Sequence, residues 1–245
     1  MEQPSAAMLV IGDELLSGRT HDANMHYLAK ELTEIGINLT EARFIRDDPA
    51  AIVSSIIELS KRFDYLFTSG GIGPTHDDIT TDCVAEAFEK KASIRSDALK
   101  ILQEYYDGKD IELNEARLRM ARIPETAELI DNPISAAPGY VIENVYVMAG
   151  VPKIFQSMLK TVIPKLEKGL PTLSLSVKIY KGEGDIALDL EEMVKAFDQL
   201  NFGSYPFSEK GVHGTNIVIR GNDKKHMEEA EDKVRSLTRN QNEKK

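Results

Sequence analysis

The chain of 245 residues has very little cysteine and no long apolar stretch. Cys83 is its one cysteine, which excludes an intramolecular disulfide and a cysteine-rich zinc site. The longest apolar runs, such as residues 6–11, are far too short to span a bilayer, and no basic segment leads into an apolar one as in a secretory signal. We therefore expect a cytoplasmic protein in a reducing setting, with no membrane partner.

The chain also lacks an excess of basic residues. Its 30 lysines and arginines stand against 40 aspartates and glutamates, which gives a formal net charge of -10. A net negative field repels phosphate, so we expect no nucleic-acid partner. A small phosphate-bearing ligand would need local help from backbone amides or from a metal ion.

What the chain does have is a glycine-rich stretch at residues 64–80, DYLFTSGGIGPTHDDIT. The short apolar run 65–68, with aromatic and β-branched residues, is typical of a buried strand. Gly70, Gly71 and Gly73 follow it, and glycines permit positive φ and a close approach of amide N–H groups to a ligand. Acidic residues and a helix start come next. Because carboxylates repel phosphate, this pattern points to an anion bound through a divalent cation.

The segment before this stretch alternates apolar strands with amphipathic helices. Strands are expected at residues 6–11 and 37–45, and the second helix is expected to begin at Asp48 and Pro49. This alternation predicts right-handed crossovers and an α/β fold, with a mostly parallel sheet between two layers of helices. Ligands of such sheets bind beyond the carboxyl ends of the strands, where we expect Gly12 and Gly71 to converge on one pocket.

The rest of the first domain is less regular. Residues 96–122 have a helical pattern and are expected to pack over one flank of the sheet. Short strands are expected after them, at residues 128–130, 140–142 and 146–148, and a last helix contains residues 154–163.

The pattern changes after a short linker at residues 169–171. The order strand, helix, strand, strand, helix in the last part of the chain predicts a small α+β domain of the ferredoxin-like, split βαβ kind. We therefore predict two domains, residues 1–169 and 170–245.

Two motifs carry a family resemblance. GDELLSGRTHDAN at residues 12–24 and GGIGPTHDDIT at residues 70–80 lie about 60 residues apart, in the order that this family has. The chain resembles the MoaB/MogA-like molybdopterin-binding domains and is most similar to the N-terminal domain of CinA, the competence/damage-inducible protein A. The same domain occurs in eukaryotic FAD synthases. The resemblance implies a MoaB/MogA-like three-layer αβα domain, and we expect a homo-oligomer, either a dimer or a trimer.

The resemblance also implies a function. Members of this family bind molybdopterin or a nucleotide, and CinA-like members hydrolyse the pyrophosphate bond of ADP-ribose or FAD with a divalent cation of the magnesium, manganese or cobalt class. The leading hypothesis is therefore a metal-dependent nucleotide pyrophosphatase whose partner is a small nucleotide or pterin phosphate. Two alternatives stay open: a non-catalytic binder of molybdopterin or a nucleotide, and a molybdopterin adenylyltransferase like MogA.

The two motifs and two later loops supply the candidate site residues. Asp78 is the first candidate for catalysis, with Asp77 beside it, and Asp13, Glu14 and Asp78 are the candidate metal ligands. The remaining candidates would bind the ligand or its phosphate: Gly12, Asn24, Ser69, Gly70, Gly71, Gly73, Pro74, Thr75, Pro138, Gly139 and Gly150.

Several of these acidic residues also have an ordinary structural explanation. Asp78 and Asp22 are of the type that commonly caps helices, and Asp13 and Glu14 follow a buried strand, where a solvated turn is common.

The basic and titratable residues near the motifs likewise have either a functional role or an ordinary surface position. His76 is a lone loop histidine, and such residues are more often exposed than catalytic. Arg117, Arg119 and Arg122 form a basic cluster that is either a solvated face or a contact to a second phosphate.

The chain departs from the family's motifs at two places. The loop at residues 132–139 reads NPISAAPG, with Ser135 and Ala136 where the family has glycine and threonine. Ile154 stands where the family has an acidic residue. Loss of a carboxylate lowers the affinity of a pocket for cations, and this favours the non-catalytic alternative.

Overall fold

The computed structural model describes residues 3–109, 111–209 and 211–237, so the polar tail beyond residue 237 lies outside the described part. The chain divides into two compact units, Met1–Gly169 and Leu170–Lys245. Each unit has a sheet and a hydrophobic core of its own. None of the described helices is long and apolar enough to cross a membrane.

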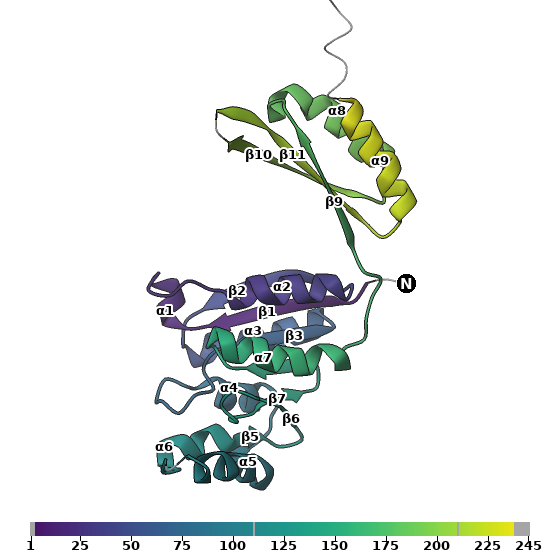
Figure 1. Ribbon diagram of the computed structural model, residues 1–245. Coiled ribbons are helices and arrows are strands. Elements are labelled where there is room, and N and C mark those ends of the chain that lie inside the picture. The colour runs from purple at the N-terminus through teal and green to yellow at the C-terminus, as the bar shows by residue number, and fades with distance from the viewer. Residues whose placement is uncertain (1–2, 110, 210, 238–245) are drawn as a thin grey trace, which may run out of the picture. The chain divides into compact units, whose positions relative to one another are not determined.

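The larger unit is built on a six-stranded sheet with the strand order β2-β1-β3-β8-β7-β6 (Figure 1). β1 (Ser5–Ile11) pairs in parallel with β2 (Asn38–Ile45) on one side and with β3 (Tyr65–Ser69) on the other. β8 (Val145–Met148) is parallel to β3, whereas β7 (Gly139–Ile142) and β6 (Glu128–Ile130) are antiparallel additions. The predicted mostly parallel sheet is confirmed.

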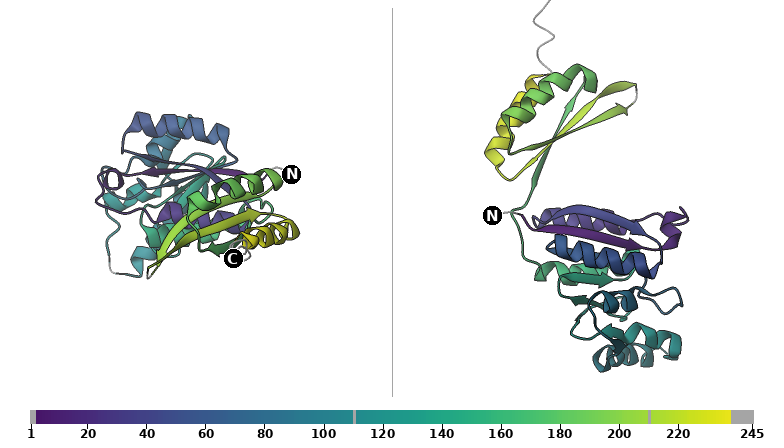
Figure 2. Two further views of the ribbon diagram at one scale, coloured as in Figure 1. Left: turned by 90° about the horizontal axis from the view of Figure 1, so that it is seen from above. Right: turned by 180° about the vertical axis from the view of Figure 1, so that it is seen from behind.

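Helices cover both faces of this sheet (Figures 1 and 2). α2 (Asn24–Glu34) and α7 (Pro152–Val162) pack on one face, where Leu28 and Phe155 are fully buried. α3 (Pro49–Arg62) and α4 (Thr80–Ala87) pack on the other face, where Ile56 and Val84 are fully buried. Since β1 lies between these two layers, its apolar run is shielded from water on both sides.

Local signals fix where the first helices begin. Asp48 caps α3, because its carboxylate accepts a hydrogen bond from the amide of Ala51 at 2.8 Å, and Pro49 is the first helical residue. At the start of α2 the carboxylate of Asp22 accepts hydrogen bonds from the amides of Asn24 and Met25. The predicted start at Asp48 and Pro49 is confirmed, whereas α2 begins one residue later than a cap at Asp22 would place it, with Ala23 at the N-cap position.

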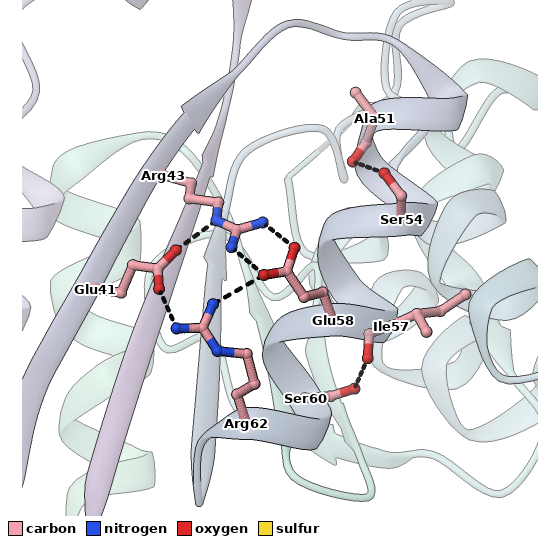
Figure 3. A network of polar contacts seen from close by, with 8 residues as sticks. All are labelled: Glu41, Arg43, Ala51, Ser54, Ile57, Glu58, Ser60 and Arg62. Atoms are coloured by element: carbon pink, nitrogen blue, oxygen red, sulfur yellow. Dashed lines mark hydrogen bonds and ion pairs between the residues drawn. The ribbon is translucent and has the colours of Figure 1, made fainter.

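β2 is an edge strand with a bulge at Thr40, which has no partner in the register with β1. Beyond the bulge, a closed ring of four charged side chains joins β2 to α3 (Figure 3). Arg43 donates to Glu41 and makes two bonds to Glu58, at 2.7 and 2.6 Å, and Arg62 closes the ring by pairing with both carboxylates. The ring ties the edge strand to its covering helix.

The flank of the larger unit contains more than the predicted helices α5 (Ser96–Asp107), α6 (Glu115–Leu118) and the short η1 (Arg119–Ala121). It also contains a two-stranded sheet, in which β4 (Ala92–Ile94) pairs antiparallel with β5 (Arg122–Pro124). The sequence pattern did not predict this pair and extended the helix to residue 122. Strands of three residues carry almost no periodic signal, because only their pairing defines them.

The smaller unit has a three-stranded sheet with the order β10-β11-β9. Its elements follow the predicted order: β9 (Leu173–Ile179), α8 (Glu183–Ala196), β10 (Asn201–Glu209), β11 (Val212–Gly221) and α9 (Lys224–Ser236). β11 is antiparallel to both neighbours, so β9 and β10 run in the same direction with β11 between them. This is the predicted split βαβ arrangement of a small α+β domain.

Candidate functional site

A cavity of about 550 Å³ opens at the edge of the larger sheet where its parallel strands end. Each strand contributes residues that follow it. Gly12 follows β1 and is succeeded by Glu14 in the short helix α1 (Asp13–Leu16), Asp47 follows β2, and the loop at residues 70–78 follows β3. The chain leaves β1 for β2 on one side and then returns to β3 on the other, so the cavity lies where the strand order reverses. The predicted convergence of Gly12 and Gly71 is confirmed.

The turn after β3 depends on two glycines. Gly70 and Gly71 have φ values of 108° and 70°, which favour glycine, and a side chain on Gly70 would collide with the carbonyl oxygen of Ile11. Fully buried Thr80 holds the turn from behind. Its hydroxyl donates to the carbonyl of Gly70 at 3.0 Å, and its amide donates to the carbonyl of Gly71 at 2.9 Å.

This arrangement leaves three successive amides without a protein partner. Within the described part of the chain, the N–H groups of Gly71, Ile72 and Gly73 donate to no backbone or side-chain acceptor. All three residues line the cavity. Successive free amides of this kind form a concavity that binds anions.

Asn24 lies behind the glycine turn and is 4% exposed. Its side-chain amide donates to the hydroxyl of Ser69 and to the carbonyl of Gly150, each at 2.7 Å. It therefore joins the start of α2 to the ends of β3 and β8. Gly150 lines the cavity, but Asn24 and Ser69 do not, so these two predicted ligand contacts support the wall from inside.

Four carboxylates line the cavity: Glu14, Asp47, Asp77 and Asp78. None of the described residues that line it is a lysine, arginine or histidine. The pKa of Asp47 is raised, first by burial and then by repulsion from neighbours that include Asp13, Glu14 and Asp77. The carboxylates that follow three different strands therefore repel one another, and this repulsion also opposes a phosphate that enters without a cation.

The predicted metal ligands Asp13, Glu14 and Asp78 are not gathered at one point. Both carboxylate oxygens of Asp13 accept hydrogen bonds from Arg46, at 3.0 Å each, and this pairing lowers the pKa of Asp13. A carboxylate oxygen of Asp78 accepts from the amide of Thr75 at 2.7 Å.

No cage for a permanently bound metal ion is therefore preformed, because the described residues contain no group of three or more His, Cys, Asp or Glu that could hold one. A magnesium ion that arrives with a phosphate needs fewer protein ligands than such a cage provides, since it usually binds through one or two carboxylates and the phosphate oxygens of its ligand. The cavity lining supplies carboxylates of this kind in Glu14, Asp47, Asp77 and Asp78. The donor set fits a divalent cation that arrives with a phosphate.

Four other predicted ligand residues remain, three of them in outer loops and one, Gly139, in β7. Pro74 lines the cavity, and Thr75 follows it in the same loop without lining it. Pro138 does not line the cavity either, and Gly139 is buried at the start of β7. A side chain on Gly139 would collide with Met158 and with the backbone of β8, which accounts for this glycine through packing.

The sequence pattern missed some lining residues. Asp47 follows β2 just as Gly12 follows β1, so the rule that ligands bind at strand ends was sufficient to find it. Asn132 and Ser135 also line the cavity, and the side-chain amide of Asn132 donates to the hydroxyl of Ser135 at 2.6 Å and to the carbonyl of Ala137. The loop thus accommodates Ser135, one of the two motif departures. Ile154, the other, adds an apolar group to the lining.

The histidine and arginine candidates lie at the surface. The side chain of His76 is 97% exposed. Arg122 pairs with Asp82, and Arg117 donates to the carbonyl of Glu112, as expected for a solvated face. The pKa of Asp77 is lowered, first by the nearby Thr75 side chain and least by the charge of Arg119, and the Thr75 hydroxyl itself donates to Asp78.

Comparison with known proteins gives two family matches. Residues 7–168 match the family described as "Probable molybdopterin binding domain", and residues 171–244 match "FAD synthase, middle domain". Together the two matches follow the division of the chain into two units.

Individual relatives are similar along most of this chain. A protein of Archaeoglobus fulgidus is 32% identical over 199 residues, which are 81% of this chain and 84% of the relative. A CinA-like protein of Kosmotoga olearia is 32% identical over 232 residues, which are 91% of this chain and 56% of the relative, so this chain spans about half of that protein. The crystal structure of CinA from Thermoplasma acidophilum superposes with a TM-score of 0.61 at 30% identity, over 66% of this chain and 98% of the other.

Proposed function

This chain belongs to the probable molybdopterin binding domain family and is CinA-like, and from this premise we propose that its cavity binds a nucleotide or pterin phosphate together with a divalent cation. One observation carries the proposal: among the described residues, the amides at 71–73 have no acceptor and lie beside four carboxylates, in a lining that contains no basic side chain. The amides would hold the phosphate, and the carboxylates would balance the charge of the cation.

We further propose that the ligand is a nucleotide pyrophosphate of the ADP-ribose or FAD class and that the chain hydrolyses it. Water adds to one phosphorus, the bridging oxygen leaves with the other phosphate, and a carboxylate accepts the proton of the water. A bound cation would neutralise charge on the phosphates. Asp47 is the carboxylate best suited to hold the proton, because burial and like charges raise its pKa. Asp77 and Asp78, on the loop after β3, would hold the cation.

A panel of ADP-ribose, FAD, NAD and ATP, each with magnesium, manganese and cobalt, tests this function by product release and by ligand binding. Asp78→Asn keeps an oxygen that can accept from the Thr75 amide but removes the charge, so it should weaken cation-dependent binding at least about tenfold while leaving the melting temperature unchanged. Glu86→Ala, on the exposed side of α4, is the matched control and should change neither property. A wild-type chain that binds none of these ligands with any cation overturns the proposal.

A second candidate function is binding without catalysis, and Ile154 is the observation that favours it. Ile154 contributes an apolar side chain to the cavity at a position where the family has an acidic residue. If Ile154 makes the chain inactive, ligands should raise the melting temperature of the wild type without being turned over. Ile154→Glu should then turn over the same ligands. Turnover by the wild type rules this candidate out. Consumption of ATP together with molybdopterin would instead indicate adenylyl transfer.

A further inference from the structure

A second depression, of about 500 Å³, lies beside the cavity and differs from it in charge. Asp13, Leu16, Ser17, Arg19 and Arg46 line it, together with Glu14, which also lines the cavity. Glu14 therefore stands between a space with two guanidinium groups and a space whose described lining has no basic side chain.

The two guanidinium groups have donors to spare. Arg46 uses Nε and Nη2 to bind Asp13, its side chain is 74% exposed, and its Nη1 makes no hydrogen bond within the described residues. Arg19 is exposed and has no hydrogen bond or ion pair to any described residue. Arginine offers a planar fork of donors that matches two oxygens of one phosphate, so this depression can hold a phosphate without a cation.

Resting on the proposed function, we infer that the depression is a second anion subsite, which binds the next phosphate of the same ligand. The phosphate at the glycine turn would bind with a cation, and the phosphate beyond Glu14 would bind directly to Arg19 and Arg46. The subsite thus selects nucleoside diphosphates and their derivatives over monophosphates. The subsite also orients the ligand, because only one phosphate of the ligand binds to the two arginines.

Asp13 gives the subsite a second property. Its carboxylate now occupies Nε and Nη2 of Arg46, and its amide donates to the carboxylate of Asp47 at 2.9 Å. A phosphate that binds Arg46 competes with Asp13 for these donors. Removal of Arg46 also leaves the Asp13 carboxylate unpaired in the depression, where it repels the second phosphate, so for ADP and ADP-ribose this arginine should matter more than Arg19.

Equilibrium binding of AMP, ADP and ADP-ribose in the presence of magnesium tests the subsite. Arg19→Gln and Arg46→Gln should lower the affinity for ADP and ADP-ribose at least about tenfold and the affinity for AMP less than about twofold, because AMP has no second phosphate. Arg46→Lys keeps the charge without the fork and should give an intermediate loss. Lys160→Gln removes an exposed charge from α7 and should change none of the affinities.

The outcomes separate this inference from the proposed function. Equal losses for AMP and ADP would indicate a general effect of charge and overturn the subsite, as would unchanged affinities for ADP in both glutamine variants. A wild-type chain that binds none of the three nucleotides overturns the proposed function and the subsite together. Arg19→Gln also separates loss of binding from misfolding. No described residue makes a hydrogen bond or ion pair with Arg19, so the melting temperature of this variant should equal that of the wild type.

Discussion

Asn24 offers the sharpest test of how the cavity wall is held together. Asn24→Ala removes two hydrogen bonds of 2.7 Å, and the carbonyl of Gly150 and the hydroxyl of Ser69 lose their donor. A hydrogen bond contributes about 1 kcal/mol net, and an unsatisfied buried group costs about 1–3 kcal/mol. Because Ser69 is buried but Gly150 is exposed, so that water can replace the lost donor at Gly150, we expect the free energy of unfolding of the larger unit to fall by about 1–3 kcal/mol.

A matched control lies at the other end of the same sheet. The side chain of Asn144, just before β8, donates to the carbonyls of Ser60 and Phe63 at 2.8 and 2.9 Å. Asn144→Ala should therefore lower stability by a similar amount, but only Asn24→Ala should also weaken binding of ligands at the cavity. Urea unfolding followed by circular dichroism measures the first effect, and titration with magnesium and ADP-ribose measures the second. A loss of less than about 0.5 kcal/mol for Asn24→Ala, at unchanged m, would refute the reasoning.

Two further predictions concern the glycine turn and the charged ring. Gly70→Ala places an alanine at a φ of 108° and against the backbone of β1, so it should lower the free energy of unfolding by at least about 2 kcal/mol. Gly108→Ala, at a residue with an ordinary φ, should change it by less than about 1 kcal/mol in the same urea assay. Hydrogen bonds, first from Arg43, lower the pKa of Glu58 to about 2, so its stabilisation is complete above the unfolded pKa of 4.5 and is lost as the pH falls toward 2. The melting temperature of the wild type should therefore approach that of Glu58→Gln as the pH falls from about 5 to about 2, whereas the difference between Glu104→Gln, in an exposed pair, and the wild type should stay constant.

The sequence was sufficient to predict the first half of the larger unit because there local and tertiary signals agree. The run at residues 6–11 is apolar throughout, and β1 is buried on both faces. Asp48 and Pro49 are both favoured at a helix start, and the helix begins there. The glycine motif located the cavity because only a turn with positive φ fits between β3 and α4.

Other features could not be predicted, because they depend on residues far apart in the chain. β4 and β5 exist through their pairing, and neither has enough residues to show a period. The ion pair of Asp13 with Arg46 joins residues 33 positions apart, and no local pattern indicates that the Asp13 carboxylate already has a partner.

The charged ring and the bulge on β2 also bear on self-association. An edge strand exposes unpaired N–H and C=O groups and can recruit a strand from a second copy, unless bulges or inward-facing charges prevent it. β2 has both: Thr40 interrupts the register, and Glu41 and Arg43 are committed to α3. We therefore expect two copies of this chain not to join their sheets through β2, and any dimer or trimer to form through helices or loops.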